Sequence, residues 1–329
     1  MITLGIVVPC YNEEQVLPET CRRLEALHGH LVAAGRISPA SRIVFVDDGS
    51  RDRTWALVAA RIDAGAPVVG IRLARNRGHQ NALLAGLLTA PGTALVSIDA
   101  DLQDDPETIA VMVDRHAEGF DVVCGVRSRR DTDSPFKRVS ARVFYRLLAA
   151  MGVETIPDHA DFRLLSRRAV EALRQFGEVN LYLRGIVPQL GFPSTTVTYE
   201  RASRLAGESK YPLSRMLALA GEAITSFSVL PLRLVTALGV AVSAGSALVI
   251  AWALWTALVA KEAIPGWAST VLPIYFLGGV QMLTLGIIGE YVGKTYLESK
   301  RRPRYTIETI AGLAAARTGN EGVAPAECT

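Results

Sequence analysis

The sequence lacks the cysteine patterns that hold metal sites or disulfide frameworks together. Only four of the 329 residues are cysteines, and no two of them form a CxxC pair (Cys10, Cys21, Cys124 and Cys328). Zinc sites and disulfide-rich folds use closely spaced cysteines, so neither is predicted. A chain of this length can bury a sizeable core without such cross-links. We therefore expect a main domain that is reduced and cytosolic.

The sequence also has little excess charge, and its first apolar run is not expected to be a signal peptide. Its formal net charge of +3 is too small for a nucleic-acid-binding protein, which concentrates basic residues on one face. No basic residue precedes the first apolar run, and Pro9 ends that run early. A signal peptide has a basic start and a small-residue cleavage site. The run is therefore predicted to be a buried strand, and no nucleic acid is expected as a partner.

Charged residues are distributed unevenly along the chain. They are frequent up to about Arg233, almost absent until Glu290, and then return as a basic cluster. Half of the residues are hydrophobic, and the mean hydropathy of +0.25 is high for a soluble enzyme. Two apolar segments, Leu234–Val259 and Thr270–Val292, are each long enough for a helix of the roughly 20 residues that cross a bilayer. They predict a two-helix transmembrane hairpin.

Basic residues flank this hairpin on both sides. They are Arg201, Arg204, Lys210, Arg215 and Arg233 before it, and Lys294, Lys300, Arg301, Arg302 and Arg304 after it. The positive-inside rule places both flanks in the cytoplasm, which predicts a multi-pass protein of the inner membrane. Small residues in the hairpin also allow it to pack against further copies of the chain, as a homo-oligomer (Gly239, Gly245, Gly278 and Gly279).

These patterns divide the chain into four parts. Residues 1–210 are predicted to form the cytoplasmic domain and residues 211–233 a juxtamembrane amphipathic segment. Residues 234–292 are predicted to hold the two transmembrane helices, and residues 293–329 a cytoplasmic basic tail. The tail after Thr306 is rich in small residues with little periodicity, and we expect it to fray.

The first part alternates short apolar runs with helix-length sequence. The runs are Gly5–Val8, Ile43–Val46, Val68–Leu73, Ala94–Ile98 and Val122–Gly125, and a helix is predicted over Glu14–Ala34. Strands that are apolar throughout and separated by helices predict a mostly parallel sheet covered on both faces. This is an α/β, Rossmann-like architecture, and ligands of such folds bind at the carboxyl edge of the sheet.

Two carboxylates, Asp99 and Asp101, directly follow one of these apolar runs. Hard oxygen ligands of this kind suit Mg²⁺ or Mn²⁺, which complete their coordination with water and phosphate. An Asp-x-Asp pair by itself is also common in turns and caps. Its position in a strand-to-helix loop, followed by Gln103 and Asp104, favours the metal site.

Other loops at the same edge offer groups for a nucleotide. Asp48 follows the second run and can accept hydrogen bonds from a base or ribose, while Asp52 or Thr54 is expected to cap the next helix. Tyr11 can stack on a base or simply pack. The stretch Arg75–His79 and a basic series can neutralise phosphate or remain solvated; the series comprises Arg127, Arg129, Arg130, Lys137, Arg138 and Arg142.

The order of these motifs resembles family 2 glycosyltransferases of the polyprenyl-phosphate type, the dolichol-phosphate mannose synthase and bactoprenol glucosyltransferase group. The motifs are Pro9–Glu14, Val46–Ser50, Arg75–Gln80, Asp99–Asp104, Asp161–Leu164, Gly207–Tyr211 and Gly289–Lys294. The resemblance covers nearly the whole chain and implies a GT-A fold. One departure is Asp105, where proline is common in the group, and it should affect the helix start more than metal binding.

The resemblance also implies roles for individual residues. The nucleoside would be held by Pro9, Tyr11, Glu13, Val46 and Asp48. The metal and diphosphate would be held by Asp99, Ala100, Asp101 and Gln103. Phosphates of donor or acceptor would contact Arg127, Arg204 and Lys210, and the lipid phosphate would bind at Lys137, Arg138 and Ser140. Asp161 would act as a base or would orient the acceptor, and orientation is favoured here.

The predicted reaction is inverting transfer of one hexose-type sugar from a UDP- or GDP-linked donor to a polyprenyl phosphate. A phosphate monoester is mostly a dianion at neutral pH, so it needs little help from a general base. A processive polysaccharide synthase would carry a Gln-x-x-Arg-Trp type motif and a larger membrane bundle, and neither is visible. A membrane-tethered sensor of nucleotide sugars is the other alternative, but it need not keep groups that stabilise a leaving diphosphate.

Overall fold

The computed structural model describes residues 1–127, 159–178, 183–200, 230–255 and 267–313. The chain divides into two compact units. The first unit comprises Met1–Ala149, Glu154–Lys210 and Arg302–Thr329, and the second comprises Ala150–Val153 and Tyr211–Arg301.

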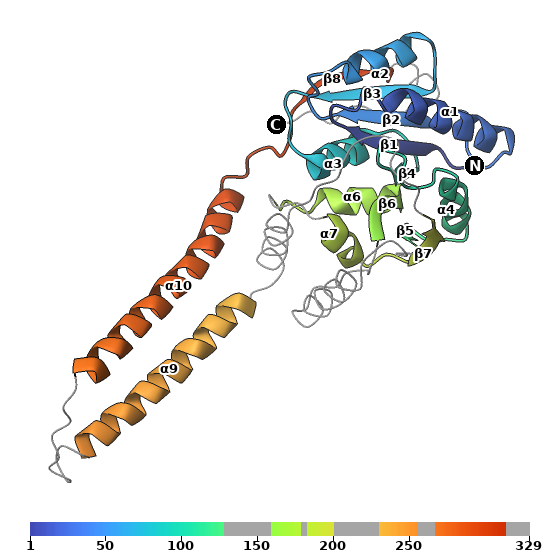
Figure 1. Ribbon diagram of the computed structural model, residues 1–329. Coiled ribbons are helices and arrows are strands. Elements are labelled where there is room, and N and C mark those ends of the chain that lie inside the picture. Colours follow the sequence, from blue (N-terminus) through green and yellow to red (C-terminus); the bar gives the residue numbers. More distant parts are fainter. Residues whose placement is uncertain (128–158, 179–182, 201–229, 256–266, 314–329) are drawn as a thin grey trace, which may run out of the picture. The chain divides into compact units, whose positions relative to one another are not determined.

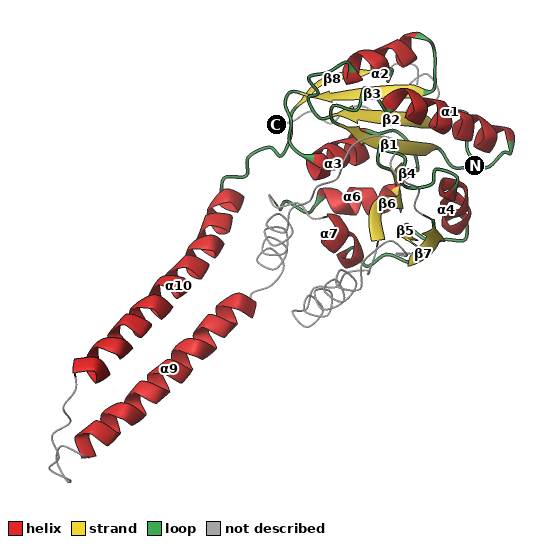
Figure 2. Ribbon diagram, in the orientation of Figure 1, coloured by secondary structure: helices red, strands yellow, loops and turns green. Residues whose placement is uncertain are grey.

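The first unit is built on one eight-stranded sheet with the strand order β7-β5-β6-β4-β1-β2-β3-β8 (Figure 2). Its strands are β1 (Leu4–Cys10), β2 (Arg42–Asp47), β3 (Val68–Leu73), β4 (Ala94–Ser97), β5 (Val122–Arg127), β6 (His159–Ser166), β7 (Ser194–Tyr199) and β8 (Ile307–Ala311). Neighbouring strands are parallel within β4-β1-β2-β3 and in the pair β5-β7. The mostly parallel α/β sheet predicted from the apolar runs is confirmed.

Helices cover both faces of this sheet (Figure 1). They are α1 (Leu17–Ala33), α2 (Thr54–Asp63), α3 (His79–Thr89), α4 (Thr108–Ala117), α6 (Arg167–Arg174) and α7 (Leu183–Gln189). Leu4, Ile6 and Val8 of β1 join a buried cluster with apolar residues of α1, α2 and α4. The intervening Val7 faces the opposite side, where α3 approaches so closely that a Cβ at Gly86 would lie 2.3 Å from Val7 Cγ1.

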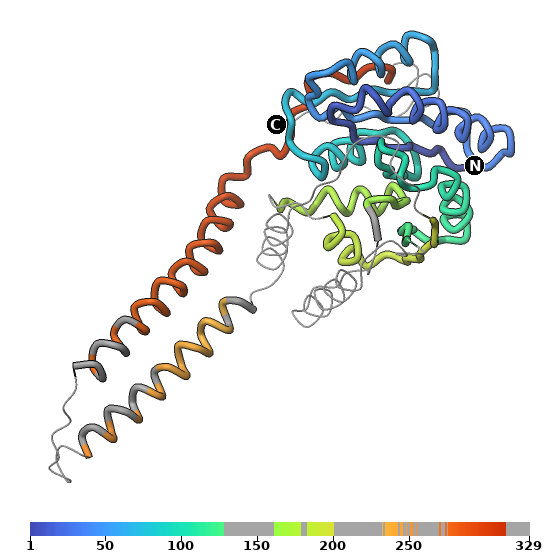
Figure 3. The backbone as a smooth tube through the Cα atoms, viewed as in Figure 1, coloured from blue at the N-terminus to red at the C-terminus, as the bar shows by residue number. Residues whose placement is uncertain are grey.

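All five predicted strands are present, but three further strands are not visible in the sequence pattern. Strand β6 runs antiparallel to both β4 and β5, and β8 runs antiparallel to β3. Apolar runs separated by helices predict parallel strands. They do not show which distant segments pair antiparallel with those strands. The expectation that the chain frays after Thr306 is wrong for Ile307–Ala311. Strand β8 pairs with β3 at the edge of the sheet. Figure 3 shows this C-terminal segment beside β3.

The second unit contains two long helices, α9 (Leu230–Trp255) and α10 (Trp267–Ser299), which contact each other. Both predicted apolar segments are therefore helical where the structure describes them, and α10 continues beyond Val292. Among the described residues, one helical stretch, Phe276–Ser299, is long and apolar enough to cross a membrane. The predicted juxtamembrane segment, residues 211–233, lies outside the described residues up to 229.

Candidate active site

The ends of β1, β2 and β4 bring three polar loops to one edge of the sheet. These strands are parallel and in register, with Pro9 opposite Val46 and Val7 opposite Ser97. Pro9 and Val46 are buried in the sheet, whereas Tyr11 just beyond β1 is 41% exposed. At this edge Tyr11 is therefore accessible, whereas Pro9 and Val46 are not; that they hold a nucleoside stays a prediction.

The first two loops are joined by hydrogen bonds from backbone to side chain. The N–H of Asn12 donates to Ser50 Oγ (2.9 Å), the N–H of Glu13 to Thr54 Oγ1 (2.9 Å), and that of Glu14 to Asp52 Oδ2 (3.1 Å). Asp52 Oδ1 also accepts from the N–H of Thr54, the first residue of α2. These bonds fix the loop that carries Tyr11 and Glu13. The N-cap of α2 is Arg53, which has no side-chain capping hydrogen bond, so the predicted capping by Asp52 or Thr54 is not observed.

Asp48 holds the loop that precedes α3. Its two carboxylate oxygens accept from the backbone N–H groups of Arg77 (2.7 Å) and Gly78 (2.8 Å). Burial raises the pKa of Asp48, and these two hydrogen bonds lower it in part. The sequence indicated Asp48 as a nucleoside ligand. Its position at the carboxyl edge allows that role, but its contacts in the structure support the 75–78 loop.

Gly49 is needed for this arrangement because the two loops approach each other there. Its φ is +68°, and a Cβ would lie 2.8 Å from both the Arg75 carbonyl carbon and the Asn76 nitrogen. L-residues pay for this backbone conformation, and the added atom would displace the 75–78 loop as well. Gly35 has the same φ of +68° with nothing within 4 Å. An alanine at Gly35 therefore measures the cost of the backbone conformation without the steric clash that an alanine at Gly49 adds.

Gly49→Ala is expected to lower the free energy of unfolding by about 3 kcal/mol, against about 1 kcal/mol for Gly35→Ala. Chemical denaturation of the two variants measures the difference. Equal losses would show that the close approach of the two loops has no energetic weight.

The loop after β4 carries the two carboxylates predicted to bind a metal. A hydrogen bond from α1 holds this loop: Thr20 Oγ1 donates to the carbonyl of Ala100 at 2.7 Å. Asp101 Oδ1 accepts from the N–H of Gln103 at 3.2 Å. Leu102, between them, has a φ of +52°. This turn sets Asp101 and Gln103 in a constrained loop at the carboxyl edge.

The oxygens of Asp99 fit the prediction of a cation site. Its Oδ1 atom is buried and has no hydrogen-bond partner among the described residues. Burial and the negative charges of Asp161, Asp104 and Asp101 raise the pKa of Asp99 to about 6, although His79 opposes the shift. A crowded, unsatisfied carboxylate of this kind is stabilised by a divalent cation.

The protein groups alone do not build a complete metal cage. Among the residues that the structure describes, no group of three or more histidine, cysteine, aspartate or glutamate side chains is placed to hold a metal ion. Mg²⁺ characteristically binds through one or two carboxylates together with phosphate oxygens and water. The pair Asp99 and Asp101 fits that incomplete arrangement.

Asp161 is a buried carboxylate at the centre of a network of charged and polar groups. It is located in β6 and is 5% exposed. Its carboxylate accepts hydrogen bonds from Gln80 Nε2 (2.9 Å), from Arg163 Nη2 (2.5 Å) and from Arg184 Nη2 (3.2 Å). His79 Nε2 lies 3.7 Å from Asp161 Oδ2 and 3.5 Å from Asp99 Oδ1. His79 thus stands between the two carboxylates.

These partners determine the ionisation of Asp161. Burial alone would raise its pKa, but the nearby His79 and the charges of Arg163 and Arg184 hold the pKa well below its usual value. A carboxylate with such a low pKa is a weak base. The orienting role of Asp161, which the sequence favoured over that of a general base, stays a prediction.

Three members of this network were not assigned from the sequence. Gln80 and Arg163 lie inside motifs that carried the family resemblance, yet neither was given a role. Arg184, in α7, lies outside those motifs. Only the fold shows that these side chains converge on Asp161. The signal in the sequence was that Gln80 directly follows His79 and that Arg163 is two residues from Asp161.

Arg127 ends β5 and faces the acidic loop. Its Nη2 lies 3.7 Å from Asp104 Oδ1, which also accepts a hydrogen bond of 2.6 Å from the Tyr199 hydroxyl. The structure thus places Arg127 beside the predicted metal loop, as a phosphate-binding role requires. The other predicted phosphate ligands lie outside the described residues (Lys137, Arg138, Ser140, Arg204 and Lys210).

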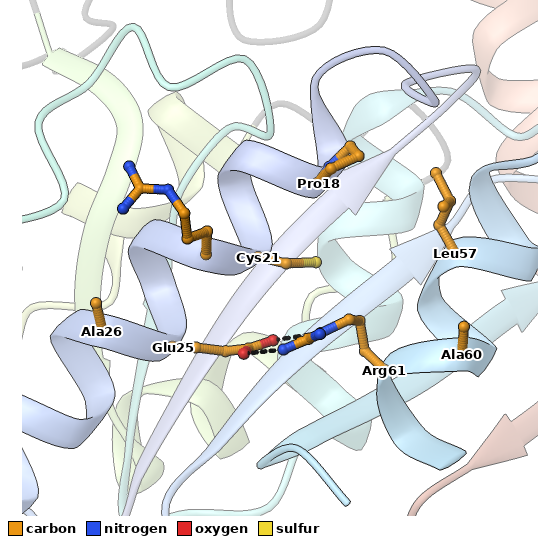
Figure 4. A pocket seen from close by; sticks show the side chains of 8 residues that line it. Pro18, Cys21, Glu25, Ala26, Leu57, Ala60 and Arg61 are labelled. Atoms are coloured by element: carbon orange, nitrogen blue, oxygen red, sulfur yellow. Dashed lines mark hydrogen bonds and ion pairs between the residues drawn. The ribbon is translucent and has the colours of Figure 1, made fainter. Parts of the chain in front are cut away.

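The pocket drawn in Figure 4 lies elsewhere. It is lined by residues of α1 and α2, with the ion pair of Glu25 and Arg61 beside Cys21. None of its lining residues belongs to the loops at the carboxyl edge. It is a surface depression between two helices and does not contribute to the site.

A mostly parallel α/β sheet with clustered carboxylates and arginines at its carboxyl edge defines a nucleotide-binding enzyme domain. The model of the family described as "Glycosyl transferase family 2" matches residues 5–174. This chain belongs to that family and is a glycosyltransferase. The GT-A fold implied by the sequence agrees with this match and with the observed sheet.

Curated relatives extend the similarity over most of the chain. An uncharacterized glycosyltransferase of Bacillus subtilis, YkoT, is 48% identical over 93% of this chain and 91% of the relative. The "Bactoprenol glucosyl transferase" of Shigella phage SfV is 39% identical over 93% of this chain and 98% of its own length. The "Prophage bactoprenol glucosyl transferase homolog" of Escherichia coli is 38% identical over 93% of this chain and 99% of that protein.

Proposed function

We propose that this glycosyltransferase moves glucose from a nucleotide-diphosphate sugar to a polyprenyl phosphate. The observation that carries the proposal is the extent of the similarity to the phage bactoprenol glucosyl transferase, which covers 93% of this chain. The family match ends at residue 174, so the remaining similarity includes sequence well beyond it. A soluble enzyme of the same family would not need the long apolar helices that lie there.

The proposal assigns α9 and α10 to the membrane as a two-helix hairpin. Both helices expose large apolar side chains, including Leu248 (73%), Trp252 (60%), Met282 (73%) and Leu285 (62%). Exposed apolar surface on this scale is unfavourable in water and favourable in lipid. Basic residues on both flanks support a cytoplasmic catalytic domain and a multi-pass inner-membrane location. Packing of the hairpin against further copies is part of the same proposal.

The donor is proposed to bind across the carboxyl edge. Tyr11 is exposed for stacking on the base, and Glu13 and Asp48 lie beside it in loops joined to each other. The diphosphate would lie near Arg127 and the acidic loop. UDP and GDP both fit this description, because the described contacts distinguish neither base.

Mg²⁺ or Mn²⁺ is proposed as the cofactor, held by Asp99, Asp101 and Gln103. The unsatisfied Oδ1 atom of Asp99 is the observation that supports it. When bound, a divalent cation offsets the negative charge that develops on the leaving diphosphate. Arg127 would contribute to the same stabilisation as a fixed positive charge.

The acceptor phosphate would approach from the side of Asp161. An oxygen of this dianion attacks the anomeric carbon, the bond to the donor diphosphate breaks, and the nucleoside diphosphate leaves with that electron pair. In-line attack on an α-linked donor gives a β-linked sugar phosphate lipid. No proton has to be removed from the attacking oxygen, which agrees with the low pKa of Asp161. Lys137, Arg138, Ser140, Arg204 and Lys210 are proposed to bind the phosphates.

The proposal is tested with full-length protein in detergent or nanodiscs. UDP- and GDP-linked sugars are supplied with undecaprenyl phosphate and Mg²⁺ or Mn²⁺, and the lipid fraction is analysed by mass spectrometry. The expected product is a lipid one hexose heavier, formed only with the phosphorylated lipid and not with undecaprenol. A growing polymer would indicate a processive synthase. Tight donor binding without consumption of any donor would indicate a sensor.

A further inference from the structure

The strand β8 attaches the chain after α10 to the edge of the sheet. Helix α10 ends at Ser299 and β8 begins at Ile307. Strand β8 pairs antiparallel with β3 over Gly70–Leu73. At its far end, Gly312 lies so close to β3 that a Cβ would be 2.6 Å from the carbonyl oxygen of Val68. Before the strand, Arg304 donates a hydrogen bond to the carbonyl of Phe176. The segment is therefore attached along its length.

Two further contacts of this segment lie at the beginning of the 75–78 loop. The N–H of Ala74 donates to the carbonyl of Thr306 at 2.9 Å. Two residues before Ala74, at Arg72 of β3, the Nε atom lies 3.5 Å from Glu308 Oε2 and also 3.5 Å from Asp47 Oδ2. Asp47 is 1% exposed and directly precedes Asp48. Arg72 thus bridges the C-terminal strand and the end of β2.

The other end of the loop is held from within the catalytic edge. Asp48 binds the N–H groups of Arg77 and Gly78, and the next two residues, His79 and Gln80, reach the site carboxylates. The loop is therefore a short connection between two anchors. Thr306 and β8 supply the first anchor, and Asp48 supplies the second.

We propose that β8 is a positioning element of the donor site, which sets the 75–78 loop and through it His79 and Gln80. The inference rests on the proposed function for the identity of the ligand, although its structural part is independent of that function. Because β8 follows α10 in the chain, the catalytic edge depends on sequence that lies beyond the second apolar helix. Glu308 and Arg72 are the positioning residues of this contact.

Two truncations of the full chain test the proposal. Removal of residues 302–329 deletes β8, whereas removal of residues 314–329 leaves it intact and serves as the matched control. Hydrogen exchange of the 74–79 amides and the Kd for UDP-glucose and GDP-glucose are measured in detergent. Of the contacts that this deletion removes, the Ala74–Thr306 hydrogen bond and the Arg72–Glu308 ion pair reach the loop. Their loss predicts about tenfold faster exchange and about tenfold weaker donor binding in the first variant. The control should match the parent chain.

A milder variant decides the question if the first truncation fails to fold. Glu308→Gln removes the charge that faces Arg72, and Thr309→Val changes the exposed neighbour in the same strand. Glu308→Gln is expected to weaken donor binding about two- to fivefold, as the loss of one exposed ion pair does, with a shift in Tm of at most a few degrees. Thr309→Val should leave both unchanged.

The proposal is overturned if the 302–329 deletion speeds exchange only in β3 while the 74–79 amides keep their protection. An unchanged donor Kd in folded Glu308→Gln would overturn it equally. If wild-type protein makes no lipid-linked sugar, the proposed function fails. The exchange rates of the loop still decide whether β8 positions it.

Discussion

Replacing Asp101 by alanine is expected to reduce formation of the lipid-linked sugar about a thousandfold. The structure places Asp101 in a constrained loop beside Asp99, whose Oδ1 atom is buried without a hydrogen-bond partner. Removing one of two carboxylates from such an incomplete cation site leaves too few ligands to hold the metal against the leaving diphosphate. The rate is measured as labelled product extracted into organic solvent.

Asp105→Ala is the matched control for this variant. Asp105 is exposed, and its Oδ1 accepts a hydrogen bond of 3.1 Å from the N–H of Glu107 near the start of α4. Loss of this exposed hydrogen bond should cost about 1 kcal/mol of stability or less and leave the rate near that of the parent. A chelator should abolish product in the wild type, with recovery on adding Mg²⁺ or Mn²⁺. Undiminished product from Asp101→Ala would count against the metal site.

Replacing Asp161 by asparagine is expected to lower both stability and activity. Arg163 is 1% exposed and depends on Asp161 for its charge partner. Breaking a buried pair by removing one charge costs about 3 kcal/mol or more, because the remaining charge stays buried. Loss of the orienting carboxylate should reduce turnover about a hundredfold. Denaturant unfolding and initial rates measure the two effects separately.

The double variant Asp161→Asn with Arg163→Met separates these causes. It removes the stranded charge, so it should be more stable than Asp161→Asn alone while remaining as inactive. The outcome against this explanation is a double variant whose loss of stability equals the sum of the losses in the two single variants. The unpaired charge of Arg163 would then not be the cause of the instability of Asp161→Asn.

The pH dependence of stability follows from the direction of the Asp161 shift. Its pKa is depressed in the folded protein, so its stabilising contribution is fully present above the unfolded value of about 4 and is lost as pH falls below it. The wild-type rate of product formation should show no acidic limb near neutral pH that depends on Asp161. A limb of that kind would be a fall in rate at lower pH that is absent from Asp161→Asn. Such a limb would assign the role of general base to Asp161.

Much of the site was predictable because it depends on strand ends. Asp48 and Asp99 each follow an apolar run, and parallel strands bring their carboxyl ends to one edge of the sheet. The predicted strands differ from the observed ones by a residue or two at their ends, and α1 begins at Leu17 instead of Glu14. Pro18 lies in the first turn of α1, where its fixed φ suits a helix start.

The antiparallel strands were not predictable in this way. Strand β6 joins the sheet through β4 and β5, and Ser97 Oγ of β4 donates to the carbonyl of Asp161. These partners are distant in the chain, and the local pattern of β6 gives no sign of them. The network around Asp161 depends on this insertion, so its members Gln80, Arg163 and Arg184 appeared only in the structure.

The sequence by itself determined the class of fold, the acidic loop and the two apolar helices, because these depend on local periodicity and on the order of residues along one segment. The tertiary structure decided which groups hold Asp161 ionised and that the chain after Thr306 forms β8 instead of fraying. Both depend on pairing between segments far apart in sequence, where the free energy comes from contacts that no local pattern encodes.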